Sequence, residues 1–271
     1  MINDFSKLKP EILKHKIIDS HIHIGPLGYL FMPSNNADKI IETMKEYGIK
    51  KAVCSAHSAL STVKYGVKET LSLIEKYPDF LYAYLVFNPN FEEISFKQMD
   101  ENLDNKNIVG IKLHPSWHAC YPRDKKYERF WGYIEERGLP VLTHSWNPDV
   151  ANKAQKFSDP FFFEEIAKKH KKLKIILAHA GGRGEMLYKV ISLLERNDNL
   201  YVDFAGDIFV PDLIEEYIDK TGSERILFGS DMPWIDFRFH IENILSSHIS
   251  EKDRANIFSL NAQKLFKISL D

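Results

Sequence analysis

Two histidines and an aspartate have the residue types and the spacing of metal ligands. His21 and His23 stand two residues apart in an apolar segment, and Asp231 directly follows another apolar run. Alternate residues of a β-strand point to the same face, so the two imidazoles are expected to project together. Imidazole nitrogen and carboxylate oxygen are common ligands of Zn²⁺ and similar ions. We predict that these side chains hold one divalent ion, with Zn²⁺ expected and Mn²⁺ as an alternative.

Two further histidines end apolar runs in the same way. His144 follows residues 141–143 and fits a third imidazole ligand, and His179 follows residues 175–178. Either could be structural, but several titratable groups in one core are costly unless something binds there. Gly181 and Gly182 would let backbone or substrate come close to this site.

Lys112 and His114 share one face of another predicted strand, where they could bind an acidic substrate. Lys112 could also bridge a second metal if carbamylated, but nothing else in the sequence supplies a second site. We therefore expect one ion. Asp19 has the same strand parity as His21 and His23 and could orient a histidine from outside the ligand shell.

Eight short apolar runs predict buried parallel strands, because strands covered on both faces lack polar alternation. They are Ile17–Ile24, Lys51–Ser55, Leu81–Phe87, Val109–His114, Pro140–His144, Lys174–His179, Leu200–Phe204 and Arg225–Ser230. Amphipathic runs between them predict helices over Ala37–Tyr47 (capped by Ser34 or Asn36), Val63–Tyr77, Tyr127–Arg137 (ending at Gly138), Asp159–His170, Glu185–Arg196 and Asp212–Lys220.

The repeated strand–helix alternation predicts a single domain over residues 1–271, an α/β fold of the (β/α)₈ TIM-barrel type. An open doubly wound sheet is the alternative. Ser250–Ile268 predicts one or two extra helices that close the barrel. In a TIM barrel the carboxyl ends of the strands carry the active site, and the polar residues above all fall there.

Composition excludes several classes of function. The formal net charge of the 271 residues is −2, which gives no sign of a nucleic-acid footprint, and Lys168–Lys174 is predicted to be a solvated helix end. Cys54 and Cys120 lie far apart without a paired motif, which predicts no disulfide framework. No secretion signal and no apolar stretch of about 20 residues is found, so we expect a cytoplasmic protein that does not bind membranes.

The strand-end motifs resemble those of the amidohydrolase superfamily, and more narrowly the amidohydrolase-related branch that includes aminocarboxymuconate semialdehyde decarboxylase. The similar motifs are Asp19–His23, Gly110–Pro115, Val141–His144, Leu177–Gly182, Leu227–Pro233 and the tail Ile257–Phe266. The resemblance implies that His21, His23, His144 and Asp231 are metal ligands. It implies that His179 is a ligand or an acid/base group.

Hydrolysis of a small carboxylate-bearing or cyclic substrate is the main functional prediction. The ion would activate a water, Asp231 would accept its proton and His179 would polarise or protonate the substrate. Substrate contacts are predicted for Lys112, His114, Arg183, Trp117 and Trp234, with Trp146 as a further wall residue.

The first alternative is decarboxylation of an aromatic or enoic acid by the same ion and ligands. A second alternative is a non-catalytic binding protein. The loops at 25–36 (Gly25, Pro26, Tyr29, Phe31) and 115–124 are expected to shape specificity. The sequence leaves the oligomeric state open, and a homodimer is one option because barrels of this kind often pair.

Overall fold

The structure is a computed structural model, and it describes residues 8–25 and 36–270. The sequence predictions for Pro26, Tyr29, Phe31 and Ser34 lie outside the described residues.

Eight parallel strands form one sheet in which the strands follow each other in chain order. They are β1 (Ile17–Ile24), β2 (Ile49–Ala56), β3 (Leu81–Val86), β4 (Ile108–Leu113), β5 (Val141–Thr143), β6 (Ile175–Leu177), β7 (Leu200–Asp203) and β8 (Ile226–Leu227). An open doubly wound sheet would reverse its strand order at a switch point. The sequential order therefore excludes that alternative.

The sheet closes into a barrel because the segment after β8 returns to β1. The Ser20 amide donates to the carbonyl of Phe228 at 2.9 Å, and the Asp231 amide donates to the carbonyl of His21 at 2.7 Å. Ile22 forms a parallel bridge with residue 232. These contacts confirm the predicted barrel, and they hold Asp231 beside the first-strand histidines.

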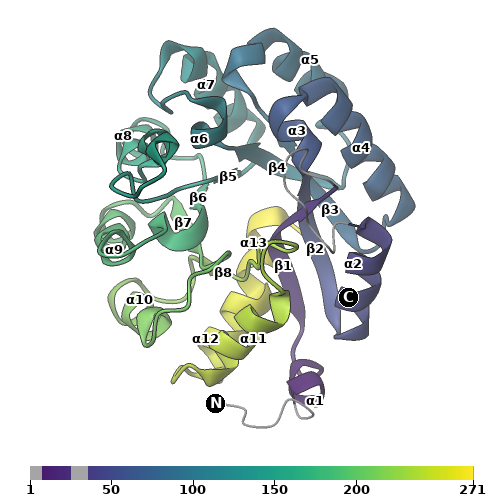
Figure 1. The fold of residues 1–271 in the computed structure, drawn as a ribbon, viewed down its shortest axis with the longest axis vertical. Helices are drawn as coiled ribbons and strands as arrows, with labels where there is room; N and C mark the ends of the chain where they lie inside the picture. Colours follow the sequence, from purple (N-terminus) through teal and green to yellow (C-terminus); the bar gives the residue numbers. More distant parts are fainter. Residues whose placement is uncertain (1–7, 26–35, 271) are drawn as a thin grey trace.

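Helices surround the ring of strands (Figure 1). They are α1 (Leu8–Ile12), α2 (Ala37–Glu46), α3 (His57–Ser61), α4 (Val63–Lys76), α5 (Glu92–Asn102), α6 (Pro115–His118), α7 (Glu128–Arg137), α8 (Phe162–Lys169), α9 (Met186–Arg196), α10 (Leu213–Thr221), α11 (Phe237–Ser246), α12 (Glu251–Ala255) and α13 (Asn261–Phe266). Short 3₁₀ turns cover Pro89–Phe91, Lys125–Tyr127, Lys153–Ser158 and Ala178–Gly181, and a π-helical turn covers Asn256–Leu260.

The predicted helix ends agree with the structure to within one residue, except that α8 begins at Phe162, three residues after its predicted start. The side chain of Asn36 caps α2 by accepting from the Lys39 amide at 3.0 Å. Gly138 ends α7 in the left-handed region, with φ of 65°. Five helices were not predicted: α1, α3, α5, α6 and α11. Helix α5 buries only Ser95, Phe96 and Met99, which is too weak an apolar pattern to recognise in the sequence.

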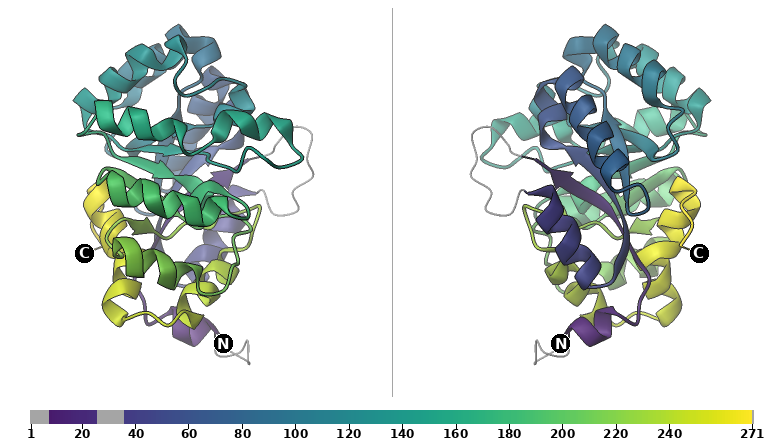
Figure 2. Two further views of the ribbon diagram at one scale, coloured as in Figure 1. Left: turned by 90° about the vertical axis from the view of Figure 1, so that its left-hand side faces the viewer. Right: turned by 90° about the vertical axis from the view of Figure 1, so that its right-hand side faces the viewer.

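The barrel interior has its own apolar core, separate from the larger layer between strands and helices. Side chains from the strands fill it, and Ala262, Phe266 and Ile268 from the carboxyl-terminal segment pack against them. Both side views in Figure 2 show the carboxyl-terminal helices at one end of the barrel. The expected closing helices are therefore present, and they cover the end opposite the carboxyl ends of the strands.

Cys54 and Cys120 are both buried and free. Among residues 8–25 and 36–270, no helix combines the length and the apolar character that crossing a bilayer requires.

Candidate active site

His21, His23 and Asp231 meet at the carboxyl end of the barrel. One ligand-type atom from each lies within 4.8 Å of the other two. Oδ1 of Asp231 is 3.3 Å from Nε2 of His23 and 3.6 Å from Nε2 of His21. The structure thus brings together the three residues that the sequence singled out first.

The chain after β8 must turn sharply to present Asp231. Asp231 has a φ of 64°, in the left-handed region that few non-glycine residues adopt. Gly229 lies so close to β1 that a Cβ added to it would be 2.9 Å from the Cβ of His21. A larger residue at position 229 would push the two ligand-bearing segments apart.

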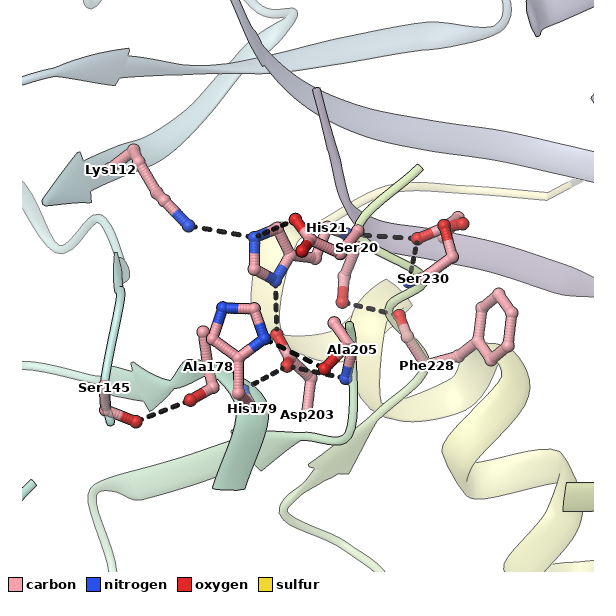
Figure 3. Close-up of polar contacts among 12 residues, drawn as sticks. Ser20, His21, Lys112, Ser145, Ala178, His179, Asp203, Ala205, Phe228 and Ser230 are labelled. Atoms are coloured by element: carbon pink, nitrogen blue, oxygen red, sulfur yellow. Dashed lines mark hydrogen bonds and ion pairs between the residues drawn. The ribbon is translucent and has the colours of Figure 1, made fainter. Parts of the chain in front are cut away.

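Each first-strand imidazole is held through the ring nitrogen that faces away from Asp231. His21 Nδ1 is 3.0 Å from Oδ2 of Asp203 (Figure 3), and His23 Nδ1 is 3.2 Å from the carbonyl oxygen of Ser55. Both acceptors require a proton on Nδ1, which leaves the Nε2 lone pairs on the side of Asp231. This is the arrangement that a metal-binding histidine needs.

The charges of these groups also suit a cation. Burial lowers the pKa of His21 and of His23, so both rings are neutral. Burial opposes ionisation of Asp231, but the facing imidazoles of His23, His21 and His179 outweigh it and hold its pKa well below the ordinary range. Two neutral imidazoles and one carboxylate form a donor set that fits Zn²⁺ or Mn²⁺.

Asp203 was not predicted, although it ends the seventh strand. It is fully buried, and its Oδ1 accepts from the amides of His179 at 2.8 Å and Ala205 at 3.1 Å. The signal was a carboxylate at the end of an apolar strand, the same signal that marked Asp231. Asp19, which was expected to orient a histidine, instead accepts from the backbone amides of His21 and Ser230 at 3.2 and 3.1 Å.

Lys112 comes from β4 and is buried beside the donor set. Its Nζ lies 2.9 Å from Nε2 of His21 (Figure 3). Burial lowers the pKa of Lys112 to about 8, against the attraction of Asp231 and Asp203. A buried amine at this position can meet an anionic group of a bound molecule.

His179 lies two residues beyond the end of β6, the strand that was predicted to end with it. Strand β6 ends at Leu177, and His179 adopts a φ of 61° within the turn Ala178–Gly181. His179 Nδ1 donates to the carbonyl of Ala205 at 2.9 Å (Figure 3), so Nε2 is the nitrogen left for a ligand. The strand end was placed wrongly because the sequence does not reveal the left-handed turn.

Three parallel rings form one wall of the site. His144 stacks on His114 at a centroid distance of 4.1 Å and on Trp146 at 5.6 Å. A Cβ on Gly182 would lie 2.6 Å from the Trp146 ring, so this glycine admits the indole against the backbone. The sequence analysis expected backbone or substrate to come close to Gly182, and in the structure the Trp146 side chain does so.

His144 is not among the donors that lie within 4.8 Å of one another. Its Nε2 is 3.1 Å from Oε1 of Gln155, a residue that was not predicted. Gln155 lies in the turn Lys153–Ser158, which has no strand-end signal, so spacing along the chain could not reveal it. The role of His144 as a metal ligand stays a prediction.

His57 is a further buried residue that was not predicted. It donates from Nδ1 to the carbonyl of Gly25 at 2.8 Å and accepts from Trp234 Nε1 at 3.1 Å. Its ring stacks on His23 at 4.8 Å. His57 directly follows β2, so the strand-end rule would have found it.

A cavity of about 300 Å³ opens above the donor set. The predicted residues that line it are His23, Lys112, His114, Trp117, His144, Trp146, His179, Asp231 and Trp234. Arg183 is not among the lining residues. It is half-exposed, pairs with Asp207, which does line the cavity, and lies over the Trp146 ring at 5.5 Å.

Residues 18–268 match the family model described as amidohydrolase. The curated proteins that the chain matches are gamma-resorcylate decarboxylases. The one from a Rhizobium species is 26% identical over 53% of this chain and 55% of that protein. The chain thus spans about half the length of the first curated relatives it matches.

Solved structures share the fold across nearly the whole chain. An uncharacterised TIM-barrel protein from Bordetella bronchiseptica has a TM-score of 0.76 and 19% identity, over 93% of this chain and 98% of that one. A dihydroxybenzoic acid decarboxylase from a Polaromonas species, solved with manganese and the inhibitor 2-nitroresorcinol, has a TM-score of 0.75 and 19% identity, over 93% and 97%. Both confirm the barrel.

Proposed function

This chain belongs to the amidohydrolase family, and we propose that it decarboxylates a small aromatic carboxylic acid with the help of one divalent metal ion. The curated relatives favour this reaction over the hydrolysis that the sequence motifs first suggested. Decarboxylation was the first alternative in the sequence analysis, and it is now the main proposal.

The observation that carries the proposal is the shape of the cavity over the donor set. Its volume of about 300 Å³ is at the small end for ligand sites, which suits a single substituted ring. Trp117, Trp146 and Trp234 line it beside the stacked imidazoles. Aromatic walls bind flat rings by stacking and edge contacts. Lys112 supplies a cation at the inner end, where a carboxylate or phenolate would lie.

His21, His23 and Asp231 would hold the ion, with His144 as a fourth donor. Mn²⁺ is the first ion to test because a solved relative carries manganese, and Zn²⁺ is the second. When bound, the ion would act as a Lewis acid on the oxygen atoms of the substrate. Lys112 contacts His21 directly, and within residues 8–25 and 36–270 the donor group found is the single set of His21, His23 and Asp231, so we propose a single ion rather than two.

The remaining side chains have separable roles. Decarboxylation breaks the bond between the ring and its carboxylate, releases CO₂, and leaves an electron pair on a ring carbon that must receive a proton. His179 keeps its Nδ1 proton on the Ala205 carbonyl, so it would deliver that proton from Nε2 only as an imidazolium that has first taken a second proton from solvent or from an acidic group of the substrate. Asp231 is ionised and can accept a proton from an acidic group of the substrate. His114 lines the cavity as a substrate contact, and Arg183 can bind an anion at the outer edge if Asp207 releases it.

The test is CO₂ release from a panel of hydroxybenzoic acids by protein loaded with Mn²⁺ or Zn²⁺. Asp231→Asn should abolish turnover while circular dichroism shows an intact fold. Asp38→Asn, which changes an exposed carboxylate on α2, should keep wild-type activity. Full activity in Asp231→Asn would contradict the assigned role. Hydrolysis of cyclic amides or lactones without CO₂ release from any acid would favour the hydrolase instead.

A further inference from the structure

The side-chain oxygen of Gln155 lies between two partners in the wall of the cavity. Oε1 accepts from the Ser116 hydroxyl at 2.7 Å and faces Nε2 of His144 at 3.1 Å. Gln155 is half-buried in the turn Lys153–Ser158, whose start is capped by the side chain of Asn152. Nothing in the sequence motifs or in the proposed reaction assigns a role to this amide.

The hydroxyl protons next to Gln155 can be assigned from their partners. Ser158 Oγ accepts from the backbone amide of Ser116 at 3.1 Å and also contacts Ser116 Oγ. Each hydroxyl has one proton to donate. If Ser158 donates its proton to Ser116 Oγ, the proton of Ser116 is left for Gln155. The chain of donors then runs from Ser158 through Ser116 to Oε1 of Gln155.

The amide oxygen of Gln155 fixes the tautomer of His144, because this oxygen has no proton to donate. An oxygen that accepts from Ser116 can only accept from His144 as well, so His144 must donate from Nε2. A neutral imidazole has one N–H, which leaves the lone pair on Nδ1. The neighbouring rings of His114 and Trp146 lie within 13° and 8° of the His144 plane and restrict its tilt.

We propose that Gln155 is a positioning residue that holds His144 in the Nε2–H tautomer and so makes Nδ1 its metal-donor atom. The metal part of this inference rests on the proposed function, whereas the tautomer does not. Outer partners of metal-binding histidines commonly fix the ring in this way. Gln155 would thus do for His144 what Asp203 does for His21.

The first measurement needs no metal. ¹⁵N chemical shifts of the His144 ring in the metal-free protein should show a proton on Nε2 in the wild type. In Gln155→Leu that preference should be lost, and in Gln155→Glu it should be kept, because a carboxylate still accepts from Nε2–H. Ser116→Ala, which removes the donor that orients the amide, should give a mixture and serves if Gln155→Leu does not fold.

The second measurement is Mn²⁺ affinity by calorimetry. Gln155→Leu should weaken binding by about 10–100-fold, Gln155→Glu should restore it, and Gln98→Leu on α5 should leave it unchanged as a matched control. Wild-type His144 with its proton on Nδ1, or wild-type affinity in Gln155→Leu, would overturn the inference. A wild-type protein that binds no metal would instead refute the proposed metal site, while the shifts still test the tautomer.

Discussion

Replacing Asp203 by Asn should reverse the tautomer of His21. Oδ1 of Asp203 accepts from the amides of His179 and Ala205, so the oxygen of an Asn side chain must stay at that position. Its NH₂ group then replaces Oδ2, 3.0 Å from His21 Nδ1, and donates to that nitrogen. The ring proton must move to Nε2, the atom that faces Asp231 at 3.6 Å. The lone pair predicted to bind the ion is lost.

The size of the effect follows from what the ring nitrogen contributes. Losing the outer partner of a metal-binding histidine weakens metal affinity by about 10–100-fold, or about 1.4–2.7 kcal/mol. We expect the upper part of this range because the tautomer is reversed rather than loosened. The assay is titration of Mn²⁺ and Zn²⁺ into metal-free protein, with circular dichroism to check the fold. Asp38→Asn is the matched control, since its carboxylate is exposed on α2.

One result would refute this reasoning. If Asp203→Asn folds and binds Mn²⁺ within about twofold of the wild type, then Asp203 does not set the metal-binding nitrogen of His21. ¹⁵N chemical shifts that still place the His21 proton on Nδ1 in Asp203→Asn would show that the tautomer has not been reversed.

The remaining predictions concern packing and pH. Gly182 has a φ of 90°, and a Cβ added to it would lie 2.6 Å from the Trp146 ring. Gly182→Ala should therefore lower the free energy of unfolding, measured in urea, by about 1–3 kcal/mol. A Cβ added to Gly132 in α7 would meet nothing within 4 Å, so Gly132→Ala should raise the free energy of unfolding by about 0.5–1 kcal/mol. A more stable Gly182→Ala variant and a less stable Gly132→Ala variant would contradict both predictions. Burial lowers the pKa of His118 from 6.5 to about 4, so the unfolded chain binds a proton between these values that the folded chain does not. Stability should therefore fall as the pH drops through this window, by about 2 kcal/mol from pH 7 to pH 5. In His118→Gln the free energy of unfolding should change less between pH 7 and pH 5 than in the wild type. The same change with pH in the variant and in the wild type would contradict this prediction.

Most of the fold could be predicted from apolar periodicity. Strand β1 has the bounds predicted for it, and Asn36 and Gly138 mark the helix ends that their residue types suggested. The errors fall where local pattern is weak or where the backbone departs from regular geometry. Helix α5 has few buried residues, and β6 ends early because His179 turns into the left-handed region.

The candidate site was predictable only where its residues end strands. His21, His23 and Asp231 carry that signal and are brought together. Asp203 and His57 also stand at strand ends and were overlooked, although the same signal marked Asp231. Gln155 carries no such signal: a turn eleven residues after His144 returns to it, and only the tertiary fold brings their side chains together.

The donor set alone does not distinguish hydrolysis from decarboxylation, because both reactions can use the same ion, carboxylate and imidazole. The rings of His114, His144 and Trp146 stack on one another in the wall of the cavity, where aromatic side chains can contact a planar ring by its face or its edge. Substitutions at His21, His23 or Asp231 would then remove turnover of every substrate, whereas substitutions at wall residues that hold no ion, such as Trp146, would change which aromatic acids are accepted. We therefore expect Trp146, which lies outside the metal-binding motifs, to influence which aromatic acids are accepted.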